Sequence, residues 1–200
     1  IVHANGSKAF EATGKLDINA AGFGTTTGKV LVQYNDSQVN YGPTNGIDLD
    51  GDNKPDFSFQ GLKAGLKGVA VTEFNADFNN FVKLQGDFSF SKVGQDIQVI
   101  ARNAQATLSA GDFSVGIRNG QLGMLILENG KKALEVSGSV YLTGGSFAQV
   151  NADKVSVRWN NTGLAYTGTK LTVNSVSYQF VNLPAATDLQ SLTITNLVAD

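Results

Sequence analysis

The feature that most constrains the fold is a pattern that occurs twice along the chain. Three stretches recur in the same order and at nearly the same spacing: residues 5–14 at 129–138, residues 29–36 at 154–161, and residues 69–74 at 192–197. The shifts are 124, 125 and 123 positions, which indicates one structural unit used more than once. We therefore expect residues 1–77 to be the C-terminal part of one repeat and residues 78–200 to be one complete repeat, cut from a longer array.

The sequence within the repeats predicts strands. Phe113, Val115 and Ile117 alternate with small residues, as they do in a strand with one buried face. Asn-Gly pairs at 119–120 and 129–130 predict tight hairpin turns, because both residues tolerate a positive φ. No window of a dozen residues has the apolar spacing of an amphipathic helix. We predict an all-β fold that is mostly a meander of neighbouring antiparallel strands.

Two architectures are compatible with such repeats. One is an elongated sheet or roll that runs through successive repeats, and the other is a row of tandem β-sandwich-like units. Separate units need a linker at each boundary, and residues 76–80 are a weak linker. We favour the elongated form.

The composition excludes several functional classes. The formal net charge is -2, so there is no basic excess to bind nucleic acid, and no apolar run is long enough for a membrane-spanning helix. The chain has no cysteine and only one histidine, His3, so thiolate sites and Ser-His-Asp catalysis are not expected. Glu128 with Glu135, or Glu73 with Asp77, could form an acid/base pair, but isolated exposed carboxylates are usually only solvated. We expect a protein that is not an enzyme.

An acidic loop carries the most specific chemistry. Asp48, Asp50, Asp52 and Asp56 hold four of the 17 acidic residues within nine positions, and Lys54 offers a main-chain carbonyl between them. Calcium prefers six to eight hard oxygen ligands, and alternate carboxylates in a tight loop converge on one point. We predict that these five residues bind Ca²⁺.

The loop resembles the Asp-rich calcium loops of integrin-like FG-GAP and VCBS-type repeats, with the form D-x-D-x-D-G-x-x-D followed by a strand. The resemblance covers Asp48–Asp56 only. Asn53 stands at the usual glycine position, and Asn is the next-best residue for the left-handed conformation. An EF-hand is excluded, because Phe59 stands where the bidentate glutamate is needed.

The acidic loop is an insertion in one repeat. Tyr41 and Phe57 are 16 positions apart, whereas the matching Tyr166 and Tyr178 are 12 apart and enclose no carboxylate. We therefore expect the inserted loop, residues 46–57, to stiffen one place in the chain, while the fold of the other repeat does not depend on calcium.

The long-period β repeats of the 200 residues are rich in Gly, Asn and Thr and contain no cysteine. In this they are similar to segments of giant secreted bacterial repeat proteins of the RTX-adhesin type. This resemblance implies an extracellular or cell-surface location in a bacterium, millimolar calcium, and a role as an adhesin-type spacer. The expected partners are neighbouring repeats of the same chain and a glycan or cell surface, with no nucleic acid and no membrane insertion, and the chain is expected to be a monomer.

The alternative is a carbohydrate-binding module of a larger secreted enzyme. Trp159 and its repeat counterpart Tyr34 could stack against a sugar ring. They are in phase with Val155, Val157 and other apolar strand residues, however, which favours a place in the core.

Overall fold

A computed structural model describes residues 1–20, 24–44, 46–78, 82–144, 149–174 and 176–199. These residues form strands and no helix: β1 (Ala9–Ala20), β2 (Gly24–Asn35), β3 (Leu66–Phe78), β4 (Val82–Val93), β5 (Asp96–Ala110), β6 (Phe113–Ile126), β7 (Lys132–Thr143), β8 (Val150–Asn160), β9 (Lys170–Val173), β10 (Val176–Gln179) and β11 (Leu189–Ala199). No helix that is long and apolar enough to cross a membrane occurs in this part of the chain.

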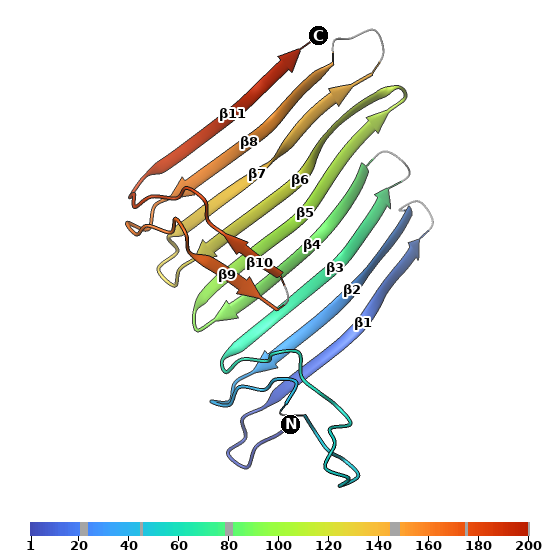
Figure 1. Cartoon of the computed structure of the whole chain (residues 1–200), viewed down its shortest axis with the longest axis vertical. Coiled ribbons are helices and arrows are strands. Elements are labelled where there is room, and N and C mark those ends of the chain that lie inside the picture. Colours follow the sequence, from blue (N-terminus) through green and yellow to red (C-terminus); the bar gives the residue numbers. More distant parts are fainter. Residues whose placement is uncertain (21–23, 45, 79–81, 145–148, 175, 200) are drawn as a thin grey trace.

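Nine strands form one antiparallel sheet in the order β1-β2-β3-β4-β5-β6-β7-β8-β11 (Figure 1). Each strand pairs with the next along the chain, except that β9 and β10 form a separate hairpin before β11 returns to pair with β8. The predicted all-β class and meander topology are confirmed.

The sheet is continuous across the predicted repeat boundary at 77/78. β3 and β4 pair from Leu66↔Val93 to Phe78↔Val82, so tandem sandwich-like units do not occur in the described residues. The linker suggested at 76–80 falls partly outside them, because Asn79 and Asn80 are not described.

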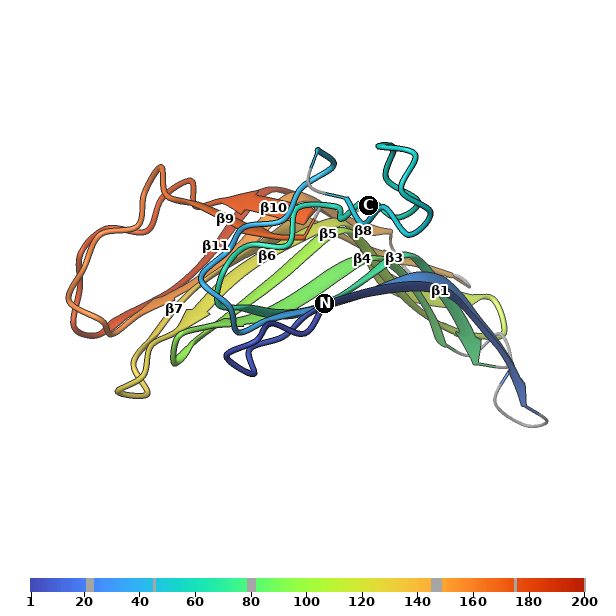
Figure 2. The same cartoon turned by 90° about the horizontal axis from the view of Figure 1, so that it is seen from below.

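The sheet is arched, with the β9–β10 hairpin and the long loops on its convex side (Figure 2). β-bulges near the middle of the strands account for the bend, because an extra residue in one strand of a pair kinks that strand. The register shifts between Val71 and Phe74 in β3 and between Ala101 and Ala104 in β5. The left-handed bulge residues have nearly equal φ values, which are 53° at Glu73, 52° at Asn103 and 53° at Asn119. Asn196 in β11 has a similar φ of 52°, although the pairing of β11 with β8 keeps one register there.

One predicted turn is wrong because it is one of these bulges. Asn119-Gly120 lies inside β6, which continues from Phe113 to Ile126. The other predicted turn is confirmed, because Gly130 N donates to Leu127 O and Leu127 N donates to Lys131 O between β6 and β7. A positive φ at Asn serves a bulge in the first case and a hairpin in the second.

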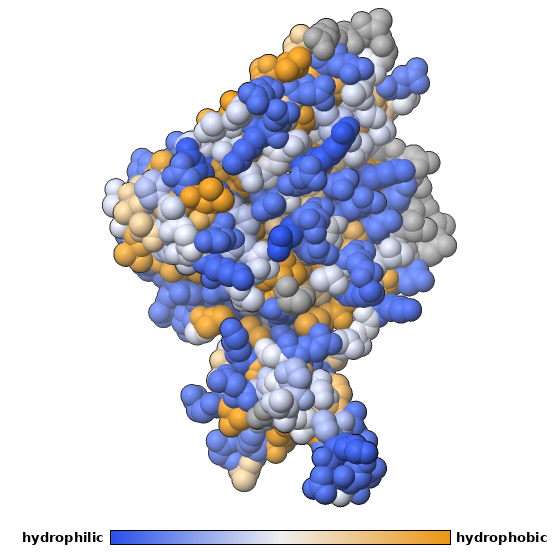
Figure 3. Space-filling view, viewed as in Figure 1, coloured by the Kyte–Doolittle hydropathy of each residue, from blue (hydrophilic) through white to orange (hydrophobic). Residues whose placement is uncertain are grey.

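Two small apolar clusters hold the covering segments to the convex face, which is otherwise largely hydrophilic (Figure 3). In the C-terminal part, β9 and β10 pack on the sheet residues Ile100 and Ala133. In the N-terminal part, the segment between β2 and β3 packs on Ala9. The covering residues of the two clusters are Tyr166, Leu171, Val173, Val176, Tyr178, Phe180 and Leu183 in the first and Tyr41, Phe59 and Leu62 in the second.

Candidate functional site

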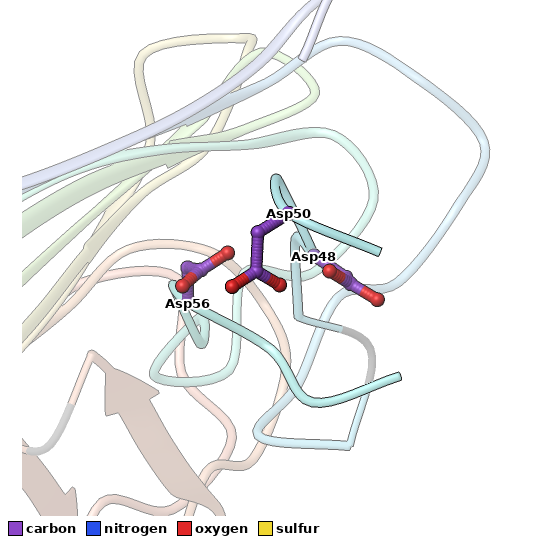
Figure 4. Close-up of side chains that lie close together, drawn as sticks. All are labelled: Asp48, Asp50 and Asp56. Carbon is purple, nitrogen blue, oxygen red and sulfur yellow. The ribbon is translucent and has the colours of Figure 1, made fainter. Parts of the chain in front are cut away.

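The acidic loop extends into solvent from the segment between β2 and β3. An antiparallel bridge between Ile47 and Phe57 closes its base, with backbone hydrogen bonds of 2.7 Å and 3.1 Å. Asp48, Asp50 and Asp56 each offer a carboxylate oxygen, and these three oxygens lie within 4.8 Å of one another (Figure 4). The loop therefore brings three of the predicted ligands together on its exposed surface.

Backbone amides fix the carboxylate of Asp48. Gly51 N donates to Oδ1 at 2.7 Å and Asn53 N donates to Oδ2 at 2.9 Å. These bonds, that of Gly51 first, lower the pKa of Asp48 below its ordinary value because they favour the charged form. The turn needs left-handed residues, with φ of 81° at Gly51 and 66° at Asn53, so the expectation for Asn53 is confirmed.

The remaining predicted ligands are arranged differently. Asp52 lies outside the group of three, and its Oδ1 accepts a hydrogen bond from Lys54 N at 2.8 Å. Asp56 Oδ2 accepts a bond from Leu49 N at 2.7 Å, which holds the two sides of the loop together. The arrangement offers a cluster of hard oxygen atoms that a divalent cation could bridge.

The counterpart of this loop is the short β9–β10 hairpin. Leu171 pairs with Tyr178 there, as Ile47 pairs with Phe57 in the N-terminal part. The aromatic contacts also correspond, because Phe59 meets Phe57 edge-on at 5.2 Å between ring centroids and Phe180 meets Tyr178 edge-on at 5.4 Å.

Two asparagines at the ends of β2 and β8 make the same hydrogen bonds. Asn35 Oδ1 accepts bonds from Ser37 N and Oγ at 3.0 Å and 2.7 Å, while Nδ2 donates to Val39 O and Leu62 O. Asn160 Oδ1 accepts bonds from Thr162 N and Oγ1 at 3.0 Å and 2.8 Å, and Nδ2 donates to two carbonyls.

The strand registers agree as well. β1 pairs with β2 through Glu11↔Gln33, and β7 pairs with β8 through Glu135↔Arg158. Residues of β7 lie 124 positions after their counterparts in β1, and residues of β8 lie 125 positions after their counterparts in β2. Thr72 pairs with Lys29, and Thr195 pairs with Lys154. Sequence similarity, hydrogen bonding and register therefore correspond over three strands in each part.

Buried carboxylates were missed by the sequence analysis, which treated Glu135 as exposed. Glu135 is only 4% exposed and accepts bonds from the Tyr178 hydroxyl, Val181 N and Asn182 N. Strand alternation is the sequence signal that could have identified its position. Glu135 follows Leu134 and therefore lies on the opposite face of β7 from this apolar residue.

Glu11 has the corresponding role in β1. It is 9% exposed, and it accepts bonds from Gln33 Nε2 at 2.6 Å and Gln60 N at 2.9 Å. In both parts a buried glutamate therefore ties the covering segment to the sheet.

A pocket adjoins each glutamate-bearing region on the convex face. Their volumes are about 400 Å³ and about 240 Å³. Lys29 and Thr72 line the first, and Lys154 and Thr195 line the second, so the two pockets occupy equivalent places.

The concave face is apolar and uncovered in the described residues. Ala101 follows Ile100, which is buried under the hairpin, and therefore lies on the opposite face. A groove of about 390 Å³ crosses this face from β4 to β8, lined by residues that include Phe88, Leu122 and Val157. Trp159 follows the same alternation and is 38% exposed, so its predicted place in a closed core is wrong.

Comparison with known proteins assigns no family. The chain matches no protein-family model, and no curated protein and no solved structure is detectably similar to it.

Proposed function

We propose that this chain is a non-enzymatic structural module in which one β building block is used twice within a continuous sheet. Support comes from the equivalent hydrogen bonds of Asn35 and Asn160, which hold the chain at the ends of β2 and β8. The matching registers of β1–β2 with β7–β8, and of β2–β3 with β8–β11, extend this equivalence. Under this proposal residues 1–77 and 124–200 are two copies of the block, called here the first and the second copy.

The first copy also binds calcium through its acidic loop. The sequence pattern and the convergence of Asp48, Asp50 and Asp56 support this assignment. A divalent cation offsets the mutual repulsion of the three carboxylates. Asp52, the Lys54 carbonyl and water supply the further oxygen ligands that calcium needs. Calcium then stiffens one projecting loop, while the second copy folds without it.

The same proposal places the module in a large extracellular or cell-surface protein of a bacterium, as an adhesin-type spacer. The composition, rich in Gly, Asn and Thr, resembles that of such proteins, and their surroundings hold enough calcium to fill a loop of this kind. The module acts by extending and orienting the chain, with neighbouring repeats as its main partners.

The carbohydrate-binding alternative receives little support from the geometry. Sugars need polar groups that fix their hydroxyls, whereas the residues lining the groove on the concave face are mostly aliphatic. Trp159 lies on that same face, in register with Leu134 and Gln190.

Isothermal titration of the full chain with CaCl₂ tests the calcium assignment. We expect saturable uptake at one site, abolished by Asp50→Ala and unchanged by Asp112→Ala, an exposed aspartate in the turn between β5 and β6. No uptake, or equal uptake in the wild type and in Asp50→Ala, would overturn it.

A further inference from the structure

The outer edge of β11 has an unusual composition for an open edge. Among the described residues, β11 pairs only with β8. Its 11 residues, LQSLTITNLVA, include no charge and no proline, and Leu192, Ile194 and Leu197 are 65%, 49% and 61% exposed. Soluble proteins usually shield edge strands with charged residues, proline or short length, because open edges recruit other strands. β11 has none of these features.

The counterpart of β11 in the first copy already has a strand on that edge. β3 corresponds to β11 with a shift of 123 positions, and both carry a left-handed residue at the matching position. Glu73 lies in a bulge of β3, whereas the pairing of β11 with β8 keeps one register across Asn196. β4 covers the outer edge of β3 with the pairs Val69↔Phe90, Val71↔Phe88 and Phe74↔Gly86. The pairing also gives the backbone amide at the bulge a hydrogen-bond partner, because Glu73 N donates to Asp87 Oδ1 at 3.0 Å.

We propose that the outer edge of β11 binds a second copy of strand β4, antiparallel, with Leu192 opposite Phe90, Ile194 opposite Phe88 and Leu197 opposite Gly86. The inference rests on the duplication proposed above. It adds an occupant, a register and a contact at the left-handed residue of β11, in which Asn196 N donates to the Asp87 carboxylate of the incoming strand. The β3–β4 junction supplies the template, and binding continues the sheet and its concave apolar face.

The opposite edge of the sheet differs in specificity. β1 corresponds to β7, whose neighbour on that side is β6, with Met124 opposite Leu134. By the same reasoning β1 accepts a strand like β6, with Met124 opposite Phe10. β1 also carries three charged residues, Glu11, Lys15 and Asp17. The two edges therefore select different strands, which gives the experiment an internal control.

Disulfide trapping tests the proposed register, because the chain has no cysteine of its own. The probe is a synthetic peptide of residues 82–93 with Phe88→Cys, added in excess to the full chain carrying Ile194→Cys under mild oxidation. We expect a cross-linked main product, and little product when the same peptide meets Leu192→Cys or the β1-edge variant Phe10→Cys. Leu192→Cys should regain cross-linking with a peptide carrying Phe90→Cys in place of Phe88→Cys.

Hydrogen exchange with the unmodified peptide gives a second readout that needs no cysteine variant. The amides of β11 that point toward β8 are already bonded, so their exchange should not change. The alternate amides, which point away from β8, should exchange about tenfold more slowly with the β4 peptide. A peptide of residues 113–126, which contains β6, should leave them unchanged and should cross-link at residue 10 when it carries Met124→Cys.

Cross-linking confined to the 194–88 and 192–90 pairs, with slower exchange of the outward amides, supports the inference. An absence of cross-links together with unchanged exchange overturns it, and so do cross-links that form equally in shifted registers or at both edges. These results are independent of the proposed function, because calcium uptake and the equivalence of the two copies are measured without the peptide.

Discussion

The hydroxyl of Tyr178 in β10 donates a 2.6 Å hydrogen bond to Oε1 of Glu135 in β7, where the hairpin lies on the sheet. The corresponding residue in the first copy is Phe57, which has no hydroxyl. There the buried Glu11 accepts its side-chain hydrogen bond from Gln33 in the neighbouring strand. The two copies therefore satisfy an equivalent buried carboxylate with donors from different segments.

Removing the Tyr178 hydroxyl should destabilise the protein. Tyr178→Phe leaves a buried carboxylate oxygen with one donor fewer, and we expect a loss of about 1–3 kcal/mol in the free energy of unfolding. Denaturant unfolding monitored by circular dichroism measures it. Tyr34→Phe is the matched control, because the Tyr34 hydroxyl bonds to Asp36 at the exposed surface, and its effect should stay within about 0.5 kcal/mol.

A compensating substitution sharpens this prediction. Arg158 occupies the position that Gln33 has in the first copy, and it bonds to Asn182 O and Ser191 Oγ. Arg158→Gln in the Tyr178→Phe background should supply the donor used in the first copy, so the double variant should be less destabilised than the sum of the single variants. Strict additivity would contradict the equivalence of the two carboxylate sites.

The same tyrosine should make the protein sensitive to alkali. Burial first, and then the hydrogen bond to Glu135, raise the pKa of Tyr178 above its ordinary value of 10.0. The stabilisation is complete below that pH and is lost as the pH rises toward the folded-state pKa, because the unfolded chain releases the proton first. Thermal unfolding at increasing pH above 10 should show this loss, and Tyr178→Phe should show a smaller slope. An unchanged slope in Tyr178→Phe would show that other groups control the alkaline transition.

The two capping asparagines should have similar effects. Asn35→Ala and Asn160→Ala each remove a buried amide that both donates and accepts hydrogen bonds, and each should lower the free energy of unfolding by about 2–4 kcal/mol. Asn129→Ala is the control, because Asn129 accepts one hydrogen bond from Lys131 N at the exposed surface. A large effect at only one of the two buried asparagines would argue against equivalent roles.

The acidic loop should lose its order at low pH. The pKa of Asp48 is lowered, so its contribution is present above its ordinary value of 3.8 and is lost as the pH falls through the lower folded-state value. In the absence of calcium, the protection factors of the Gly51 and Asn53 amides, which correct for the slower intrinsic exchange in acid, should fall over that range. Asp48→Asn should exchange rapidly already at neutral pH. Amides that stay protected in acid would show that the Asp48 carboxylate does not hold the loop.

Much of the fold could be predicted from local sequence, because strand alternation and the Asn129-Gly130 turn depend on neighbouring residues only. Asn119-Gly120 could not be predicted in the same way. An Asn-Gly pair supplies positive φ to a turn or to a bulge, and pairing of Gly120 with Ala104 in the adjacent strand decides in favour of the bulge. That contact is set by the register of the whole sheet.

In the acidic loop, too, some features follow from local sequence and others do not. The spacing of its aspartates predicted a cluster, and Asp48, Asp50 and Asp56 do converge. The departure of Asp52 from the group depends on its bond to the Lys54 amide, which the spacing does not reveal. Trp159 was expected inside a closed core because alternation identifies a shared face, but alternation does not tell whether a second layer covers that face.

A crystal structure of the full chain gives the most direct test of one β block used twice, with residues 9–14 and 29–41 superposed on residues 133–138 and 154–166. We expect Glu11 to coincide with Glu135 and Asn35 with Asn160, each bonded to the equivalent backbone groups of its covering segment. Different strand paths for the two segments, or unrelated partners for the two asparagines, would contradict it.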